Sequence, residues 1–243
     1  MNSIKKQIYG QLEKYPNLRN SLVGIYTFLS STGNKRKISG NHNSIKVNNS
    51  LLKNVVFDIV GNNNKILVDN ESQLNGVVFF IRGSHHNIYI GKRCKFNRGS
   101  SIWLEDNNCS LIINDNTSIE DAHIALTEPN SKIYIGSDCM LAYDIDIRCG
   151  DSHSIIELAT GKRINYARNI EIQDHVWIAA HTRILKGVCI EKNSVVATGA
   201  IVTKHVPSNS IVAGNPAKVV KMGISWDRKR IYDASSSEID IKE

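Results

Sequence analysis

Apolar residues recur at every sixth position in one stretch of the chain. Between residues 172 and 202 these positions hold Ile172, Ile178, Ile184, Ile190, Val196 and Val202. Neither the helical period of about 3.6 residues nor simple strand alternation makes such a rhythm. Short strands of about three residues, each ended by a small or polar corner, do make it, and three such sides form one coil. The rhythm therefore predicts a parallel β-helix with apolar side chains stacked inside.

The same rhythm extends upstream in triplets, and we expect the first of them to begin the solenoid. The triplets are Ile45, Leu51 and Phe57; Val68, Leu74 and Phe80; Ile90, Phe96 and Ile102; Ile113, Ile119 and Ala125; and Ile135, Leu141 and Ile147. From Val68 onward they start 22, 23 and 22 residues apart, which is more than a coil of three six-residue sides needs. The extra residues, such as "GSHHN" and "EDNNCS", are polar and turn-forming, so we expect them at one corner of each coil.

The two ends of the chain do not follow this rhythm. Residues 3–30 carry apolar residues at helical spacing, interrupted by Pro16, which predicts two short helices that cap the first coil or lie beside it. The sequence thus predicts an all-β dominated protein. It has an N-terminal helical arm at 1–40, a β-helix domain at 41–221 with an inserted loop at 157–170, and a short C-terminal helix and tail at 222–243.

The positive charge is concentrated at the N-terminus. Of the formal net charge of +7, residues 1–37 hold +6, from seven basic side chains and Glu13. The rest of the chain is nearly neutral, which argues against a nucleic-acid-binding groove in its body. A solvated face, an anionic polymer and a membrane surface remain open as roles for the basic arm.

The apolar runs indicate where the protein resides. They fall far short of the roughly 20 residues that cross a bilayer, and the N-terminus shows no signal-peptide pattern. We therefore expect a cytoplasmic protein, with contact at the inner face of the membrane left open.

The cysteines and histidines predict no metal site. The five cysteines form no C-x-x-C pair, so neither a disulfide framework nor a thiolate zinc site is expected, and they read as small buried hydrophobes. A metal-dependent β-helix, such as a trimeric carbonic anhydrase of the gamma type, would need converging histidines. His175 and His181 are six residues apart, which places them on adjacent sides of the coil, so we expect them to diverge.

The rhythm breaks after Ile147 and returns only at Ile172. His153 lies six residues past Ile147, at the corner where earlier coils carry their extra residues. We therefore expect it on the outside of the prism, at the base of the inserted loop. Trp177 belongs to a different corner of the following coil, about one side away. A neighbouring subunit packed in parallel would bring the two side chains together, which predicts a homotrimer with a shared site.

Several motifs follow one another in a specific order over roughly residues 135–230. They are "DSHSI", "TGKRIN", "VWIAAHTRI", "VVATGAIVTK", "GNPAK" and "ISWDR". Together they resemble the hexapeptide-repeat acyltransferases, and among them the O-acetyltransferases of bacterial capsular polysaccharides such as polysialic acid. The chain departs from the family pattern at Ala179, where glycine is usual, and at His205, where an acid is common. The resemblance implies a left-handed β-helix and an enzyme that moves an acetyl group from acetyl-CoA to a sugar hydroxyl.

The resemblance also assigns roles to residues. It implies that His153 is the general base for the hydroxyl proton, with Asp151 orienting or polarising it, and that Trp177 lies along the pantetheine arm of acetyl-CoA. The implied cofactor-binding positions are Ala179, Ala197, Thr198 and Gly199 on the coil faces, and Lys204, Asn215, Pro216, Ala217 and Lys218 at the adenine and phosphate end. Lysine suits that end as a point charge for phosphate.

Other functions remain open at the level of the sequence. Cys149, four residues before His153, could carry the acetyl group covalently, although direct transfer is preferred because strand alternation explains its placement. A non-catalytic β-helix scaffold is a further alternative. The preferred acceptor is an anionic surface polysaccharide, while a small sugar, a nucleotide sugar or a xenobiotic would also present a hydroxyl.

Overall fold

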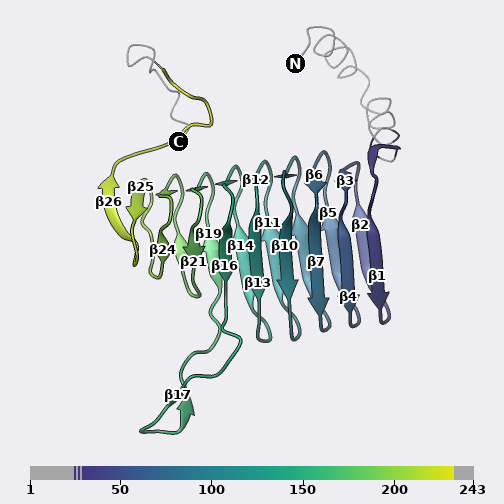
Figure 1. Ribbon diagram of the computed structural model, residues 1–243, viewed down its shortest axis with the longest axis horizontal. Helices are drawn as coiled ribbons and strands as arrows, with labels where there is room; N and C mark the ends of the chain where they lie inside the picture. Colours follow the sequence, from purple (N-terminus) through teal and green to yellow (C-terminus); the bar gives the residue numbers. More distant parts are fainter. Residues whose placement is uncertain (1–24, 26, 28, 233–243) are drawn as a thin grey trace.

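The computed structural model describes residues 25, 27 and 29–232. Over these residues the chain winds into a three-sided solenoid whose strands succeed one another along a single axis (Figure 1). Each side is one parallel sheet, here named A, B and C in the order in which the chain visits them. The corners between them are the A/B, B/C and C/A corners.

The strands of each sheet pair with the equivalent strands of the coils before and after. Sheet A has the order β1 (Lys35–Ser39), β4 (Val56–Val60), β7 (Val77–Arg82), β10 (Ser100–Leu104), β13 (Ala122–Leu126), β16 (Ile145–Arg148), β21 (Arg183–Ile184) and β24 (Ile201–Val202). Sheet B has the order β2 (Ser44–Val47), β5 (Lys65–Val68), β8 (Asn87–Ile90), β11 (Ser110–Ile113), β14 (Lys132–Ile135), β19 (Ile170–Ile172) and β22 (Cys189–Ile190).

Sheet C closes the prism on the side opposite the A/B corner. In chain order its strands are β3 (Leu51–Lys53), β6 (Gln73–Asn75), β9 (Lys95–Phe96), β12 (Ser118–Ile119), β15 (Met140–Leu141), β20 (Trp177–Ile178), β23 (Val195–Val196), β25 (Ser210–Ala213) and β26 (Lys218–Met222). The last strand, β26, turns back and pairs antiparallel with β25.

The apolar residues that recur at every sixth position form the interior of this prism. Ile172, Ile178, Ile184, Ile190, Val196 and Val202 are all buried, with at most 1% of their surface exposed. Ile102 and Ile147 from the upstream triplets are also completely buried. Full burial of such a side chain contributes about 1.5–3 kcal/mol to the free energy of unfolding, and every coil buries several of them. The predicted parallel β-helix is confirmed.

Three of the predicted interior positions are wrong by one residue. Phe79 and Ile124 face the interior with none of their surface exposed, whereas Phe80 and Ala125, their neighbours in sequence, face outward. The reason is a C/A corner that is one residue shorter before β4, β7 and β13 than before β10, β16, β21 and β24. Phe79 pairs with Ile102, yet it follows the preceding interior position by five residues instead of six. Leu52 takes the place predicted for Leu51 in the same way.

The corners use residues that tolerate a left-handed backbone. At the B/C corner, positive φ angles occur at Asn49, Glu71, Arg93, Asn116, Asp138, His175, Asn193 and Asn209. Most of these are Asn, Asp or His, which adopt this conformation more readily than other non-glycine residues. The extra residues of the upstream coils lie at the A/B corner, as the sequence predicts. There Gly61 has φ +137°, and a Cβ on it would lie 1.8 Å from the carbonyl oxygen of Gly83 in the next coil.

The two ends differ from the predicted boundaries. β1 begins at Lys35 and pairs with β4, so the solenoid starts before residue 41 and takes three of the basic residues assigned to the arm. The predicted N-terminal helices lie mostly outside the described residues, although Ile25, Thr27, Leu29 and Ser30 are helical. Residues 223–232 follow β26 without a helix. Among the described residues, no helix is long and apolar enough to span a membrane.

The register of β7 gives a direct test of this interior. Phe79→Ala should lower the free energy of unfolding by about 3–5 kcal/mol, because it leaves a cavity inside the prism. Phe80→Ala removes an outward ring that stacks on Trp103 at 3.8 Å between centroids, and should cost about 1 kcal/mol. Urea unfolding of both variants beside the wild type measures this difference. Equal losses, or a larger loss for Phe80→Ala, would contradict the register.

Candidate active site

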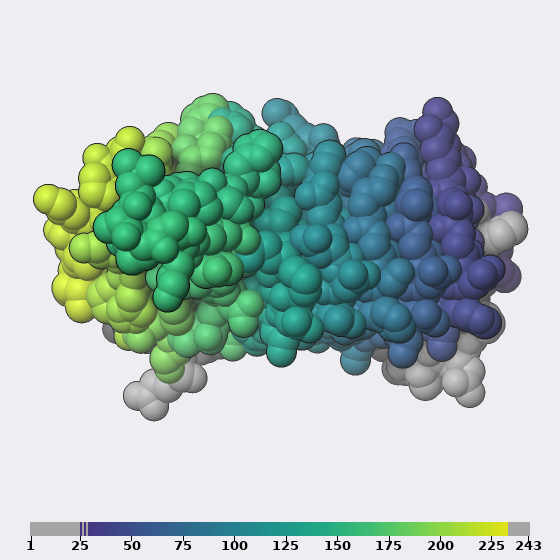
Figure 2. Space-filling model, turned by 90° about the horizontal axis from the view of Figure 1, so that it is seen from below, coloured from purple at the N-terminus to yellow at the C-terminus, as the bar shows by residue number. Residues whose placement is uncertain are grey.

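An insertion leaves the solenoid at the A/B corner between β16 and β19 (Figure 1). It spans residues 149–169, so it begins earlier than the predicted loop at 157–170. It carries an antiparallel hairpin of β17 (Ile156–Glu157) and β18 (Lys162–Arg163). Seen from below, it stands out over the C-terminal coils (Figure 2). Its exposed apolar side chains are Ile155, Ile156, Leu158, Ile164 and Tyr166.

The root of the insertion is held together by one buried amide. Asn165, only 6% exposed, accepts a hydrogen bond from the Ile155 N–H through its Oδ1 at 2.7 Å. Its Nδ2 donates to the Asp151 carboxylate and to the His153 carbonyl oxygen, each at 2.7 Å. Asn165 therefore fixes the backbone on both sides of His153.

Asp151 binds the neighbouring coil. Its carboxylate accepts a hydrogen bond from Lys186 Nζ at 2.5 Å, and the same ammonium donates to the Asn165 carbonyl oxygen at 2.9 Å. Burial alone would raise the pKa of Asp151, but the hydrogen bonds from Lys186 and Asn165 outweigh it and hold the pKa below its usual value. The carboxylate is thus ionised at neutral pH and anchors the root of the insertion. It makes no hydrogen bond to the His153 ring within this single chain.

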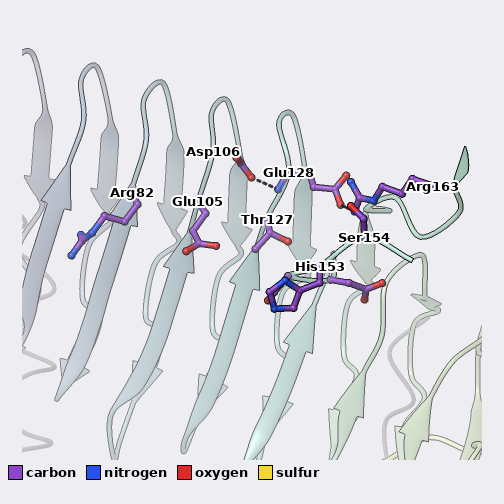
Figure 3. Close-up of a pocket in the computed structure, with 10 residues that line it drawn as sticks. Arg82, Glu105, Asp106, Thr127, Glu128, His153, Ser154 and Arg163 are labelled. Atoms are coloured by element: carbon purple, nitrogen blue, oxygen red, sulfur yellow. Dashed lines mark hydrogen bonds and ion pairs between the residues drawn. The ribbon is translucent and has the colours of Figure 1, made fainter. Parts of the chain in front are cut away.

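His153 borders a cleft of about 340 Å³ between the insertion and the A/B corner (Figure 3). The cleft is lined by Arg82, Glu105, Asp106, Thr127, Glu128, Asp151, Ser152, His153, Ser154 and Arg163. The imidazole is exposed, and none of the hydrogen bonds of the described residues involves its ring nitrogens. This matches the predicted position of His153 on the outside of the prism.

The walls of the cleft are polar. Arg163 forms an ion pair with Glu128, and Arg82 forms one with Asp58 at 2.9 Å. The hydroxyl of Thr127 is buried and has no hydrogen-bond partner, which is rare for a buried polar group. Carboxylates and hydroxyls of this kind suit a ligand with many hydroxyl groups, since they accept and donate hydrogen bonds in turn.

The residues implied for cofactor binding fall into three groups. Ala179, Ala197, Thr198 and Gly199 lie at the C/A corner, where the Gly199 N–H donates to the Ala180 carbonyl oxygen at 2.9 Å. The segment from Asn215 to Lys218 joins them there, because the Ala217 N–H bonds to the Ile201 carbonyl oxygen at 2.8 Å. Lys204, in contrast, follows β24 at the A/B corner.

Trp177 stands apart from both corners. It is the first residue of β20, on the outer face of sheet C, with 36% of its surface exposed. Since sheet C lies opposite the A/B corner, one chain does not bring Trp177 to His153. This agrees with the sequence expectation that the two residues are separated within a subunit.

Comparison with known proteins identifies the fold family. No protein-family model matches the chain. The polysialic acid O-acetyltransferase of Neisseria meningitidis is 34% identical over 227 residues, which cover 84% of this chain and 94% of that protein. The chain belongs to the hexapeptide-repeat acetyltransferases.

Two further relatives agree with this assignment. The crystal structure of NeuO, a polySia-specific acetyltransferase, matches with a TM-score of 0.75 and 31% identity over 84% of this chain and 93% of that one. The polysialic acid O-acetyltransferase of Escherichia coli O1:K1 is 38% identical over 118 residues, which span 49% of this acetyltransferase but only 38% of that protein's length. The left-handed β-helix and the acetyltransferase activity implied by the motifs are confirmed.

The structure also bears on the alternatives. Cys149 is completely buried and burial raises the pKa of its thiol, so it is a poor nucleophile for a covalent route. His175 lies at the B/C corner and His181 at the C/A corner, where each pairs with a different aspartate. In the described part of the acetyltransferase, no three His, Cys, Asp or Glu side chains gather as metal ligands.

Sequence reasoning missed Asn165 and Lys186. Both act by contacting Asp151, which is 14 residues from Asn165 and 35 residues from Lys186 in the chain. Asn165 lies within the motif "TGKRIN", but only its burial shows that it holds the root of the insertion.

The pair of Asp151 and Lys186 predicts a pH dependence. Because folding lowers the pKa of Asp151, the pair stabilises the root at neutral pH, and this contribution is lost as the pH falls through the lowered pKa. The pair is partly exposed, so its contribution is at most about 1 kcal/mol. Asp151→Asn should therefore speed amide hydrogen exchange in residues 150–169 at neutral pH, and the difference from the wild type should vanish in acid.

A matched control is Asp144→Asn, at the C/A corner. The pKa of Asp144 is also lowered, by hydrogen bonds from His181 and Arg183, but it does not contact the insertion. Its substitution should leave exchange in residues 150–169 unchanged. Identical exchange in Asp151→Asn and the wild type at neutral pH would contradict the anchoring role of Asp151.

Proposed function

We propose that this acetyltransferase moves an acetyl group from acetyl-CoA to a hydroxyl of an acidic capsular polysaccharide, with polysialic acid as the first acceptor to test. The observation that carries the chemistry is the unpartnered imidazole of His153 beside a polar cleft. The choice of acceptor is supported by the relatives from Neisseria meningitidis and Escherichia coli, which are polysialic acid O-acetyltransferases.

His153 is the general base of the reaction. Neutral imidazole can accept a proton near neutral pH, so His153 takes the proton of the acceptor hydroxyl as its oxygen attacks the acetyl carbonyl carbon. The carbon–sulfur bond of the thioester then breaks. His153 returns its proton to the departing thiolate, which leaves as the thiol of coenzyme A, and the sugar carries the new ester.

Asp151 positions His153 indirectly, by holding the backbone of the turn that carries it. It holds the turn between β16 and the hairpin by binding Lys186 and Asn165, and Asn165 in turn binds the carbonyl group of His153. The imidazole is therefore presented from a fixed turn while its ring stays free for the acceptor. This preorganisation reduces the conformational freedom that binding would otherwise have to restrict.

The donor lies along the C/A corner. The small residues Ala179, Ala197 and Gly199 allow a pantetheine arm to approach the coil closely, and Trp177 lines the same arm from sheet C. Asn215, Pro216, Ala217 and Lys218 form the adenine and phosphate end, where the lysine binds phosphate as a point charge. Lys204 follows β24 at the A/B corner, away from these residues of its own chain, and would bind phosphate only as a residue of a neighbouring subunit.

A homotrimer completes this site. His153 lies at the A/B corner and Trp177 on the opposite sheet, so a shared site needs the A/B corner of one subunit beside the donor residues of its neighbour. Exposed apolar groups on the insertion support such a contact. The Leu158 side chain is 99% exposed, and clustered exposed hydrophobes mark contact surfaces.

The basic N-terminal region has a proposed role in locating the enzyme. Lys35, Arg36 and Lys37 are exposed on β1, at the end of the solenoid away from the insertion (Figure 1). They would attract an anionic polymer or the inner face of a membrane. We propose that the reaction takes place in the cytoplasm, where capsular polymer would meet acetyl-CoA.

The reaction is tested by thiol release from acetyl-CoA with purified acceptors. Polysialic acid, a neutral capsular polymer, a nucleotide sugar and a small sugar are compared, with mass analysis of each product. His153→Ala should lower turnover about 10²–10⁴-fold, the usual scale for loss of a general base, and leave coenzyme A binding intact. His85→Asn replaces another exposed histidine of the A/B corner and should keep wild-type turnover. Wild-type turnover in His153→Ala would refute its role.

The shared site is tested by mixing two inactive variants. If His153 and Trp177 meet between subunits, randomly mixed trimers of His153→Ala and Trp177→Ala contain about a quarter of their sites with both residues intact. Activity should then reappear after the two are unfolded and refolded together. If both residues act within one subunit, no site is repaired and the mixture stays inactive.

A further inference from the structure

The C-terminal strap, residues 224–230, lies along the B/C corner of the solenoid. Its start is tied to the last coil, where the Ile224 N–H donates to the Asn209 carbonyl oxygen and Asn209 Nδ2 donates to the Ile224 carbonyl oxygen, both at 3.0 Å. Its far end reaches Ser118 of β12, which accepts a hydrogen bond from Arg228 at 2.7 Å. The strap therefore spans several coils on the side of the donor residue Trp177.

Trp226 is the centre of the strap. Its indole stacks on the His175 ring at 4.2 Å between centroids, with an angle of 7° between the planes. Its Nε1–H donates to the His175 carbonyl oxygen at 2.8 Å, while His175 Nε2 lies 2.9 Å from the Trp226 carbonyl oxygen. The other ring nitrogen of His175 binds Asp138 at 2.8 Å. Two residues that are 51 apart in sequence thus fix each other.

Arg228 holds the strap beyond Trp226. Its Nε donates to the Asp138 carboxylate at 3.1 Å and its guanidinium to the Cys139 carbonyl oxygen at 2.8 Å. Trp226 is therefore fixed from both sides, and the position of its ring is set by the solenoid.

This fixed ring borders Trp177. The two indoles lie 6.1 Å apart between centroids, with 49° between their planes. Trp177 follows His175 by two residues, and Trp226 is its one aromatic neighbour among the ring contacts of the described residues. We propose that Trp226 is a positioning residue, which holds the Trp177 indole in the orientation that the acetyl donor requires. This inference rests on the donor role of Trp177 in the proposed function.

The location of Trp226 separates a role in positioning Trp177 from a role in stabilising the fold. Interior packing in this coil comes from Val176 and Ile178, both completely buried, whereas Trp226 lies outside the prism. Loss of its ring leaves the interior intact. An aromatic pair is worth about 0.5–1.5 kcal/mol beyond the area it buries, which corresponds to roughly a two- to twelvefold change in a binding constant.

The test compares Trp226→Ala, Trp226→Phe and Lys229→Ala in the full chain. Trp226→Ala should weaken coenzyme A binding in calorimetry, and raise KM for acetyl-CoA, about two- to twelvefold. KM for the acceptor should stay within about twofold, since the strap lies away from the cleft of His153. Trp226→Phe keeps the stack on His175 and should restore most of the binding. Lys229→Ala, an exposed residue of the same strap, should match the wild type.

A spectroscopic signature checks the geometry without any turnover. The close indoles of Trp177 and Trp226 should give an exciton couplet in circular dichroism, which Trp177→Phe and Trp226→Phe each remove and Trp103→Phe leaves in place.

Three outcomes would overturn the inference: unchanged coenzyme A binding in Trp226→Ala, a missing couplet, or a wild type that does not bind coenzyme A. Wild-type protein that binds coenzyme A but acetylates no polysaccharide would contradict the proposed acceptor alone.

Discussion

The parallel hydrogen-bond ladder between consecutive coils is the constraint on which the rest of the structure depends. Each strand pairs with the equivalent strand one coil away, and this pairing holds even where the number of residues in the coil changes. Ile147 pairs with Ile184 across the insertion, with the same register that the insertion-free coils keep. A corner can therefore gain residues without disturbing the interior, provided that the chain returns to the same place.

This constraint decides where chemistry can occur. The interior is apolar and closed, so polar groups that act on a ligand must lie on outer faces or at corners. The A/B corner carries His153 with its cleft, while the C/A corner and sheet C carry most of the residues proposed to bind the donor. Within one triangular prism these surfaces point in different directions. A second subunit, packed alongside, can bring its C/A corner and sheet C to face the A/B corner of the first. The insertion, whose apolar side chains are exposed in the single chain, extends from the same corner as His153.

The sequence predicted the fold and the exposed position of His153, because both follow from counting residues along a repeating coil. Counting residues gave the wrong interior position where two apolar residues are adjacent, as with Phe79 and Phe80. When the corner is one residue shorter, the sixth position is still apolar, so the sequence does not reveal that the fifth position is the buried one. Counting also failed for contacts between distant coils. The six-residue pattern does not predict the ion pair of Asp151 with Lys186 or the stack of Trp226 on His175. Each contact joins different coils, so it depends on the position of each residue along the solenoid axis.

The central claim is that the ladder places a free imidazole at one corner and the donor site of a neighbouring subunit beside it. A crystal structure of the protein with coenzyme A measures this most directly. The account predicts a trimer in which coenzyme A lies along Ala179, Thr198 and Lys218 of one subunit, with its thiol end facing His153 of the next. Coenzyme A bound elsewhere on the solenoid, or a thiol end remote from every His153, would contradict it.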